Sequence, residues 1–598
     1  MTFFAALRMT VLAALLLLAT PARALDVTHY RLEIDLRADD EALAGAATLD
    51  ILLDAADVGA GAVPLDFVGL EVTGLFVDGL ADEAWSRDGA VLSVPLPPGA
   101  AAGDLVQVEV RYEGVPTPYV APWGTWGVVR SQDRIFTVNV TEGARHWFPC
   151  DDRLDDKASV ELLVSVPDPW LVAAPGTLLA QEPDGDARTR FHWSADWPLP
   201  TYLIHFAAGP YILTTEEHDG VPYQTWLHPT LHEDAADTFA HAPAAMEMLT
   251  ARYGPYPFPK VGFDEIDLGG AVENPSCISI GTQILVPDQV YEDVIAHELS
   301  HTWFQGVVTV ASWDDVWLSE GMATYHEALY HEHVHGPGTL AEYTDSLGIS
   351  YRAMAEMAEG FFPLSKPESL WGVTTYRKGA LVLHTLSHLL GREVFDQALV
   401  DYLEAFAWGN ATTEDFRQVL ESTAGRDLDS FFDEWVHGTG YPQFGLGWRH
   451  DPGAGTVDVA VDQRQPEDWP IFRSVPLEVE LAFSDGGVQR EVMELTDRLT
   501  IAAFAVPAAP TSVTLDPDHW ILKTVDPMDF PNVGPEDPPT GDAVGPEGPP
   551  TGDAAGPGGP PTGSGGCDSG ASAPPAGLLF LLLLAVLVPA RLRHSLLI

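Results

Sequence analysis

One short stretch of the chain carries residue types that can hold a metal ion. His297 and His301 are four positions apart, and Glu298 lies between them. On a helix, side chains four positions apart project from the same face one turn apart, so both imidazoles can reach one ion. Glu298 is placed roughly one position round the helix, where it can meet a metal-bound water without being a ligand. Residues 294–296 are apolar, so we expect this helix to be buried, where unpaired His and Glu side chains are costly.

Glu320 is the candidate third ligand. It lies in the segment 317–321, Trp-Leu-Ser-Glu-Gly, far enough downstream to belong to a second helix packed beside the first. Two His, one Glu and a vacant fourth position form the ligand set of a catalytic zinc ion rather than a structural one. A bare His-Glu-x-x-His pattern also occurs by chance, with side chains that make ordinary hydrogen bonds. The context of the third carboxylate favours a metal site, and we predict one Zn²⁺ per chain.

The chain is strongly acidic and too long for one domain. It has 598 residues, with 87 acidic and 30 basic side chains and a formal net charge of −57. This balance disfavours nucleic acid and anionic membrane surfaces as partners and is typical of a solvated acidic surface. Three cysteines are too few for a disulfide scaffold. Cys150 and Cys277 could pair after export, but the sequence does not decide this.

The order of the segments predicts several domains. Residues 1–24 have a basic, an apolar and a small-x-small region and are interpreted as a secretory signal peptide; the apolar run is short for an uncleaved anchor. Residues 25–213 contain short alternating runs broken by Gly, Pro and Asp, which predicts a largely antiparallel β-sheet domain. Residues 214–442 contain longer helical stretches and the metal motif. Residues 443–526 alternate again, which predicts a small β-sandwich.

The tail has a different composition. Residues 527–575 include three eleven-residue Gly- and Pro-rich repeats, which predict a disordered linker. Residues 576–598 form a hydrophobic segment followed by Arg591 and Arg593. Its apolar run of 14 residues spans about 21 Å as a helix, short of the ~30 Å hydrocarbon core of a membrane. The segment resembles the C-terminal sorting tails of the myxobacterial type. We expect an exported protein that is tethered to a membrane by this tail, at the cell surface or facing the outer membrane and periplasm, or that is released from it.

Three motifs in chain order resemble the M1-type gluzincin zinc aminopeptidases, the superfamily of aminopeptidase N and leukotriene hydrolase. Residues 270–274, Gly-Ala-Val-Glu-Asn, match the Gly-x-Met-Glu-Asn motif of that family with Val in place of Met. Residues 297–301 and Glu320 match its zinc motif, including the eighteen-residue gap, and residues 375–379 match its Tyr-x-Lys-Gly segment. The resemblance runs from about residue 25 to 525. It implies a multidomain α+β protein with a thermolysin-like mixed α/β catalytic domain at 214–442.

The resemblance also implies roles for single residues. Glu298 acts as general base, and Tyr376 donates a hydrogen bond to the oxyanion of the reaction. Gly270, Ala271 and Glu273 lie along the substrate, and Glu273 binds its free α-amine. From the residues alone, the small side chains at 269–271 allow an edge strand to lie close to a ligand, with Glu273 at the rim of a cleft. The alternative, a glycine-rich turn with a solvent-facing Glu273, is disfavoured by the zinc helix about two dozen residues downstream. Without the resemblance, Tyr376 would be a packed helix residue. The implied substrates are peptides with free N-termini.

One position departs from the family pattern. Aminopeptidases of this type usually carry a second acid or amide near the amine, and the aligned residue here is Val140. Glu142 lies two residues later and, on a strand, would point to the same face, so it could substitute. The sequence therefore predicts a zinc aminopeptidase. The alternatives are a zinc endopeptidase, a hydrolase of a non-peptide substrate such as an epoxide, and a catalytically silent surface binding protein. The sequence does not indicate an oligomeric state.

Overall fold

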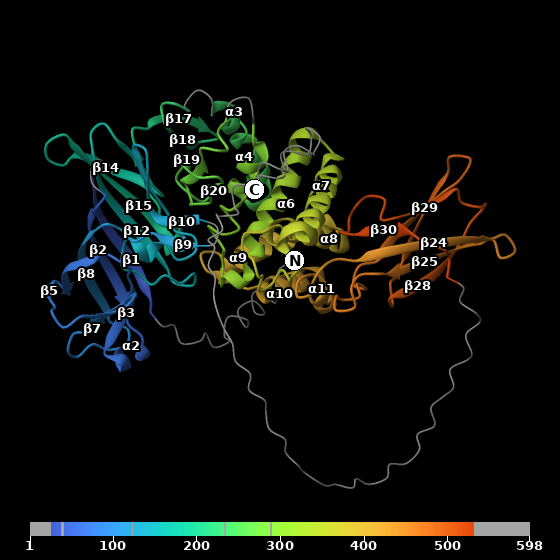
Figure 1. The fold of residues 1–598 in the computed structure, drawn as a ribbon, viewed down its shortest axis with the longest axis horizontal. Coiled ribbons are helices and arrows are strands. Elements are labelled where there is room, and N and C mark those ends of the chain that lie inside the picture. The colour runs from blue at the N-terminus through green and yellow to red at the C-terminus, as the bar shows by residue number, and fades with distance from the viewer. Residues whose placement is uncertain (1–24, 38–40, 122–123, 232–234, 287–289, 532–598) are drawn as a thin grey trace, which may run out of the picture.

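The structure, a computed structural model, describes residues 25–37, 41–121, 124–231, 235–286 and 290–531. Within these ranges the chain forms three parts that follow one another along the sequence, as Figure 1 shows. The first part is built from β-sheets, the second from helices and a mixed sheet, and the third from two small sheets. The expected multidomain α+β class is therefore confirmed, while the domain bounds at residues 213 and 442 stay predictions.

Three predicted segments at the ends of the chain are not covered, or only in small part. The signal peptide 1–24, the tail 576–598 and all but the first residues of the linker 527–575 lie outside the described residues. Among the helices that the structure describes, none is both long and apolar enough to cross a membrane.

An eight-stranded sheet organises the first part. In spatial order its strands are β14 (Thr177–Pro183), β15 (Arg188–Pro200), β12 (Lys157–Pro167), β1 (Val27–Leu36), β2 (Leu43–Leu52), β8 (Leu105–Gly114), β4 (Glu71–Val77) and β5 (Leu80–Ala81). Only the pair β1–β12 is parallel, so the predicted largely antiparallel sheet is confirmed. In β1, Tyr30, Leu32 and Ile34 are buried and the residues between them are partly exposed, as a two-residue period requires.

Two smaller sheets and three short helices complete the first part. One sheet has the order β13 (Leu171–Ala173), β16 (Ala207–Gly209), β11 (Arg134–Val138), β10 (Gly124–Ser131), β9 (Tyr119–Ala121); the other has the order β3 (Ala62–Asp66), β7 (Val91–Pro95), β6 (Ser86–Asp88). The helices are α2 (Ala55–Ala60), η1 (Ala144–His146) and η2 (Thr201–Leu203). Cys150 and Cys277 are both buried free thiols, so the pairing that the sequence left open is not made.

The second part contains a five-stranded mixed sheet. Its order is β17 (Ile212–His218), β18 (Val221–Leu227), β19 (Val261–Ile266), β21 (Ile278–Gly281), β20 (Ala271–Val272). The three middle strands run parallel, and the two outer ones run antiparallel to their neighbours. The predicted edge strand near residue 271 is confirmed, since β20 closes the sheet and Glu273 follows it directly.

Helices make up the rest of the second part. They are α3 (Ala236–Phe239), α4 (Ala242–Tyr253), α5 (Glu292–Ser300), η3 (Trp313–Asp315), α6 (Trp317–His335), α7 (Thr339–Met354), η4 (Ala355–Glu359), η5 (Thr374–Lys378), α8 (Gly379–Leu390), α9 (Arg392–Phe406), α10 (Thr413–Ala424) and α11 (Asp429–Trp435). Two short strands, β22 (Thr309–Val310) and β23 (Asn410–Ala411), pair in parallel between them.

A glycine contact fixes how α6 meets the start of α8. A Cβ atom on Gly321 would lie 3.0 Å from the Cα of Gly379, and a Cβ on Gly379 would lie 2.9 Å from the Cα of Gly321. Real Cβ atoms do not come as close as 2.9 Å and rarely come as close as 3.0 Å, so the approach favours glycine on both helices. Gly321 follows Glu320, and Gly379 lies three residues after Tyr376. The contact therefore brings Tyr376 to the candidate metal ligand.

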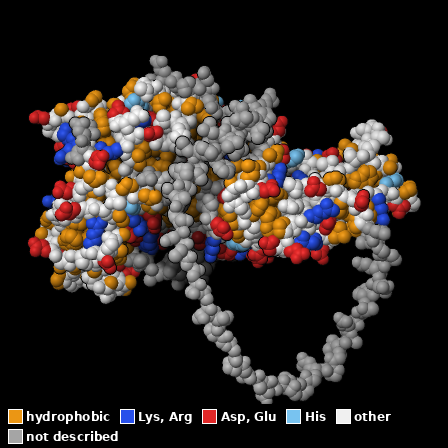
Figure 2. Space-filling model, viewed as in Figure 1, with side chains coloured by type: hydrophobic (Ala, Val, Ile, Leu, Met, Phe, Trp, Pro, Cys, Tyr) orange, Lys and Arg blue, Asp and Glu red, His pale blue; other side chains and the backbone are white. Residues whose placement is uncertain are grey.

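Two sheets form the third part, as the alternating pattern predicts. One has the order β28 (Leu499–Ala505), β25 (Thr456–Gln463), β24 (Gln443–Asp451), β30 (Thr524–Pro527); the other has the order β27 (Val488–Met493), β26 (Leu477–Ala482), β29 (Ser512–Leu515). Glu434 of α11 accepts hydrogen bonds of 2.9 Å from the backbone N–H groups of Arg473 and Ser474, which ties the second part to the third. On the face drawn in Figure 2, acidic side chains are spread over the described surface, in keeping with the net charge.

Candidate metal and catalytic site

The two helices that carry the candidate ligands are buried together. Every residue of α5 from Asp293 to Ser300 is buried, as its apolar flank predicts, and His301 caps its C-terminal end. Glu320 lies in the first turn of α6, which packs against α5. Nε2 of His297 is 3.4 Å from Oε2 of Glu320, and Nε2 of His301 is 3.6 Å from the same oxygen. These separations suit three ligands of one tetrahedral ion.

The second ring nitrogen, Nδ1, of each imidazole also has a hydrogen-bond partner. Nδ1 of His297 lies 2.7 Å from Oε1 of Glu327, one of two carboxylates that α6 contributes to the site. Nδ1 of His301 lies 3.2 Å from the carbonyl oxygen of Phe304 and 3.1 Å from Oγ of Ser319. Such partners set the tautomer and ring orientation of a metal-ligating histidine. Both rings therefore present Nε2 to the same point.

The charge at this point suits a cation. Burial alone would lower the pKa of His297, but Glu320 and Glu327 raise it well above its usual value. Burial opposes ionisation of Glu320, yet the charge of His301 and the hydrogen bonds from both imidazoles bring its pKa down to about 2. The same negative charge that attracts protons onto the imidazoles would attract a divalent ion. The residues present therefore fit zinc.

Glu298 stands beside the triad with an unused oxygen. It is 7% exposed, and its Oε2 is buried without a hydrogen-bond partner among the described residues. Burial raises the pKa of Glu298 to about 7, although His297 and His301 oppose the shift. A buried carboxylate oxygen without a partner is costly, so a bound water or substrate group would stabilise it here. This is the position that the sequence predicts for a general base.

Tyr376 packs against the imidazole of His297. Its ring stacks on that of His297 with 5.9 Å between centroids and 12° between planes. Burial and the nearby charges of Glu320, Glu273 and Glu298 raise the pKa of Tyr376 well above its usual value. The phenol therefore stays protonated and can donate a hydrogen bond. It also lines a cavity of about 330 Å³. The other lining residues are Met354, Ala358, Glu359, Ser369, Trp371, Gly372, Val373 and Arg377.

Glu273 reaches the site from the sheet edge. Oε1 of Glu273 accepts a 3.0 Å hydrogen bond from the hydroxyl group of Tyr202, which in turn accepts one from the side chain of Gln305. Burial raises the pKa of Glu273, and the charges of His301 and Glu320 also act on it, so the carboxylate lies close to the triad. Ala271 lies on β20 and Gly270 just before it, and a Cβ atom on Gly270 would meet nothing within 4 Å. The edge of the sheet is thus open beside the site.

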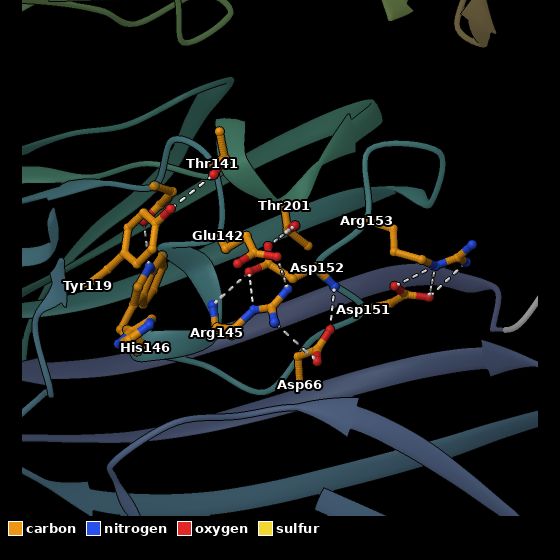
Figure 3. A network of polar contacts seen from close by, with 12 residues as sticks. Asp66, Tyr119, Thr141, Glu142, Arg145, His146, Asp151, Asp152, Arg153 and Thr201 are labelled. Atoms are coloured by element: carbon orange, nitrogen blue, oxygen red, sulfur yellow. Dashed lines mark hydrogen bonds and ion pairs between the residues drawn. The ribbon is translucent and has the colours of Figure 1, made fainter. Parts of the chain in front are cut away.

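The prediction that Glu142 lies on a strand is wrong. Residues 140–143 form a turn after β11, closed by a 2.8 Å hydrogen bond from the N–H of Gly143 to the carbonyl oxygen of Asn139. Glu142 is 53% exposed at its side chain, and its Oε1 lies 3.3 Å from Nη2 of Arg145. Figure 3 shows the Arg145 guanidinium group among Glu142, Asp152 and Asp66. The contacts described for Glu142 therefore belong to this network, and none of them joins it to Glu273.

Several residues of the site were not predicted from the sequence motifs. Glu327 lies seven positions after Glu320 on the same helix, and this two-turn spacing could have marked it as a partner of the ligands. Ser319 adjoins a predicted ligand. Tyr202 and Gln305, by contrast, reach Glu273 from distant segments, and no spacing in the sequence points to them.

A buried His–His–Glu triad with an unpaired carboxylate beside it is the kind of ligand set that catalytic zinc centres use. Residues 238–435, which contain the triad, Glu298, Glu273 and Tyr376, match the model of the Peptidase family M1 domain. This part of the chain is thus similar to M1 peptidase domains. The match implies a catalytic zinc ion at His297, His301 and Glu320.

The chain is also similar to curated aminopeptidases. It is 28% identical over 384 residues to human aminopeptidase RNPEPL1, a stretch that covers 59% of this chain and 51% of that protein. It is 27% identical over 395 residues to aminopeptidase B of Rattus norvegicus, with 60% and 58% covered. Aminopeptidase N of Streptomyces lividans is 29% identical over 346 residues, with 52% and 39% covered. The matched stretch thus spans about half of the length of such relatives.

Solved structures share the fold. An M1 zinc metallopeptidase from Deinococcus radiodurans superposes with a TM-score of 0.63 at 24% identity, covering 70% of this chain and 95% of that one. Aminopeptidase A of Legionella pneumophila gives a TM-score of 0.73 at 17% identity, with 86% and 60% covered. The arrangement of a β part followed by a largely helical part is therefore shared with these two structures.

Proposed function

We propose that this chain is a zinc-dependent aminopeptidase that removes N-terminal residues from peptides. The observation that carries the proposal is the buried triad beside the unpartnered Oε2 of Glu298. The similarity of the chain to curated aminopeptidases supports the same activity. A mutant of the Deinococcus radiodurans peptidase is bound to a Tyr-Ser-Ala substrate, which supports a peptide as the substrate here.

The reaction follows from the side chains around the triad. When bound, the zinc ion supplies Lewis-acid chemistry, polarising a carbonyl group and making water more acidic. Glu298 accepts the proton of the attacking water at Oε2 and later gives it to the leaving amine. A pKa of about 7, raised by burial, suits a group that must take and return a proton near neutral pH. Tyr376 donates its hydroxyl proton in a hydrogen bond to the oxyanion that develops on the substrate.

Glu273 makes the cleft selective for free N-termini. Its carboxylate is oriented by Tyr202 and feels the charges of His301 and Glu320, so it can pair with the α-ammonium group of a peptide beside the triad. The open edge at Gly270 and Ala271 leaves room for a substrate backbone beside β20. Endopeptidase action is the alternative if Val140 has weakened amine binding. Hydrolysis of a non-peptide substrate on the same zinc is the other enzymatic alternative, whereas the complete set of catalytic side chains disfavours a silent binding protein.

The test compares free with N-acetylated peptides of the same sequence. We expect the wild-type chain to cleave free peptides one residue at a time and to spare the acetylated ones. Glu273→Gln should raise KM for free peptides and reduce the preference, because the ammonium group loses its charged partner. Equal cleavage of both sets by the wild type would establish an endopeptidase. Cleavage of neither, with zinc bound, would point to a non-peptide substrate such as an epoxide.

We also propose that the enzyme is exported and held at a membrane by its tail. The support is the sequence alone: a signal-like segment at 1–24, a Gly- and Pro-rich linker at 527–575 and a hydrophobic tail at 576–598 that resembles sorting tails of the myxobacterial type. N-terminal sequencing of the mature chain with fractionation of the producing cells tests this. A mature protein that keeps residues 1–24 and remains in the cytosol would contradict it.

A further inference from the structure

A second group of His and Glu side chains lies at the far end of the same two helices. The ligand atoms of Glu292, His331 and His335 all lie within 4.8 Å of one another. Glu292 is the first residue of α5, and the two histidines belong to the last turns of α6. Residues 331–335 read His-Glu-His-Val-His, which repeats the His-Glu-x-x-His pattern of residues 297–301.

We propose that Glu292, His331 and His335 bind a second divalent ion of the type that prefers imidazole ligands, with zinc as the ion to test. His331 and His335 are four apart on a helix, so their rings share one face. Nε2 of His335 lies 3.0 Å from Oε1 of Glu292, a spacing that two ligands of one ion can adopt. Two imidazoles and a carboxylate are a ligand set that zinc accepts, with solvent in the fourth position.

The surroundings hold these ligands in place. Oε2 of Glu292 lies 3.2 Å from Nδ1 of His241, so the oxygen that faces away from the histidine pair already has a partner. Nδ1 of His241 lies 2.9 Å from the hydroxyl group of Tyr330 as well. The ring of His331 stacks on that of Tyr343 with 4.5 Å between centroids. Ligand groups that are fixed by outer partners lose less freedom when an ion binds.

Charge and access favour a cation from solution. The last turn of α6 carries the partial negative charge of a helix C-terminus, which stabilises a cation. The side chains of His335 and Glu292 are 43% and 20% exposed, so an ion can reach them directly. With a formal net charge of −57, the chain as a whole also attracts divalent cations.

The simpler reading is an ion pair between a protonated histidine and Glu292. That reading explains the contact of His335 with Glu292 and leaves His331 to its stacking contact with Tyr343. A metal ion uses all three side chains. It would also join the start of α5 to the end of α6, and so brace the two helices that hold the catalytic ligands.

Glu332, the middle residue of this second motif, is not free to act as a base. Its Oε2 lies 2.6 Å from Nη2 of Arg392, at the surface. The proposed site is therefore a structural or regulatory ion site, and the proposal adds no second catalytic centre.

The test measures zinc content and heat stability of the full chain. After loading with excess Zn²⁺ and dialysis, the wild type should retain two zinc ions per chain, one at each site. The His331→Gln/His335→Gln double variant should retain one. Zn²⁺ is also titrated into protein whose catalytic site is already filled. The double variant should bind the second ion at least about 100-fold more weakly than the wild type, because losing even an outer partner of a ligand lowers metal affinity by about 10- to 100-fold. The midpoint of thermal unfolding should rise with added Zn²⁺ only where the second site is intact.

His333→Gln is the matched control. His333 lies on the same turn of α6, is exposed and is not a member of the cluster, so this variant should retain two ions. A wild type that retains one ion would overturn the proposal without any variant. A double variant that binds the second ion as tightly as the wild type would also overturn the proposal, because the ion would then lie elsewhere. If the double variant does not fold, the single variant His335→Gln at the exposed end of the helix decides the same question.

Discussion

The α5–α6 pair carries the same motif at both of its ends, in different surroundings. Residues 297–301 lie on α5 and converge with Glu320 of α6, and every one of these ligand groups is buried. Residues 331–335 lie on α6 and converge with Glu292 of α5, and these groups are partly or fully exposed. In each case two imidazoles four residues apart meet a carboxylate of the other helix.

The middle glutamate of each motif marks the difference between the two ends. Oε2 of Glu298 is buried without a partner among the described residues, whereas Glu332 is a quarter exposed and pairs with Arg392. A general base needs a free lone pair that faces the substrate, and an ion-paired carboxylate in solvent does not provide one. The motif therefore sets which atoms can meet an ion. Burial and the partner of the middle residue decide whether hydrolytic chemistry follows.

The largest effect should come from removing one imidazole at each end. His301→Gln should lose the catalytic zinc and reduce kcat/KM by about 10⁴-fold or more, because the Lewis acid contributes several kcal/mol to the transition state. His335→Gln should leave kcat/KM near that of the wild type. Steady-state kinetics on an amino-acid anilide, with metal analysis of both variants, measures this. Equal losses in the two variants would mean that the outer motif takes part in catalysis.

A smaller loss is expected from the middle glutamates. Glu298→Gln should lower kcat by about 10²- to 10³-fold, within the range for a lost general base, while zinc stays bound. Glu332→Gln loses only a surface ion pair and should keep its kcat, with a change of stability below about 1 kcal/mol. The measurements are kcat, zinc content and the unfolding midpoint of each variant. A Glu298→Gln enzyme that retains full kcat would exclude Glu298 as the base.

The parts of the site that could be predicted from the sequence are those with helical spacing. His297, His301 and Glu298 are fixed relative to one another by one turn of helix, and a third carboxylate follows from the need for another ligand. The edge strand before Glu273 was also predictable, because the small residues at 269–271 fit the end of a sheet. Their roles in binding and catalysis stay predictions that the variants above test.

What the sequence could not provide depends on contacts between distant segments. Tyr202 reaches Glu273 across 71 positions, and no periodicity encodes that contact. The strand expected at Glu142 failed for a local reason: a Cβ atom on Gly143 would lie 2.7 Å from the Cα of Asn139, so the chain folds sharply there. Arg145 then draws Glu142 towards Asp66 and Asp152, and Asp66 belongs to a strand almost eighty residues earlier.

The smallest effect should come from the partners that hold the ligands. Glu327 accepts a hydrogen bond from the Nδ1–H group of His297, and both groups are buried away from water. Glu327→Gln keeps the shape of the side chain but removes its charge, so the affinity for the catalytic zinc should fall by about 10- to 100-fold. His241→Gln at the outer end should weaken only the second, proposed ion, because it touches Glu292 and not the catalytic triad. Competition with a chelator of known affinity measures both constants. If Glu327→Gln left the affinity for the catalytic zinc unchanged, burial alone would be enough to orient His297. The difference between the catalytic site and the proposed outer site would then depend on Glu298 and Glu332 alone.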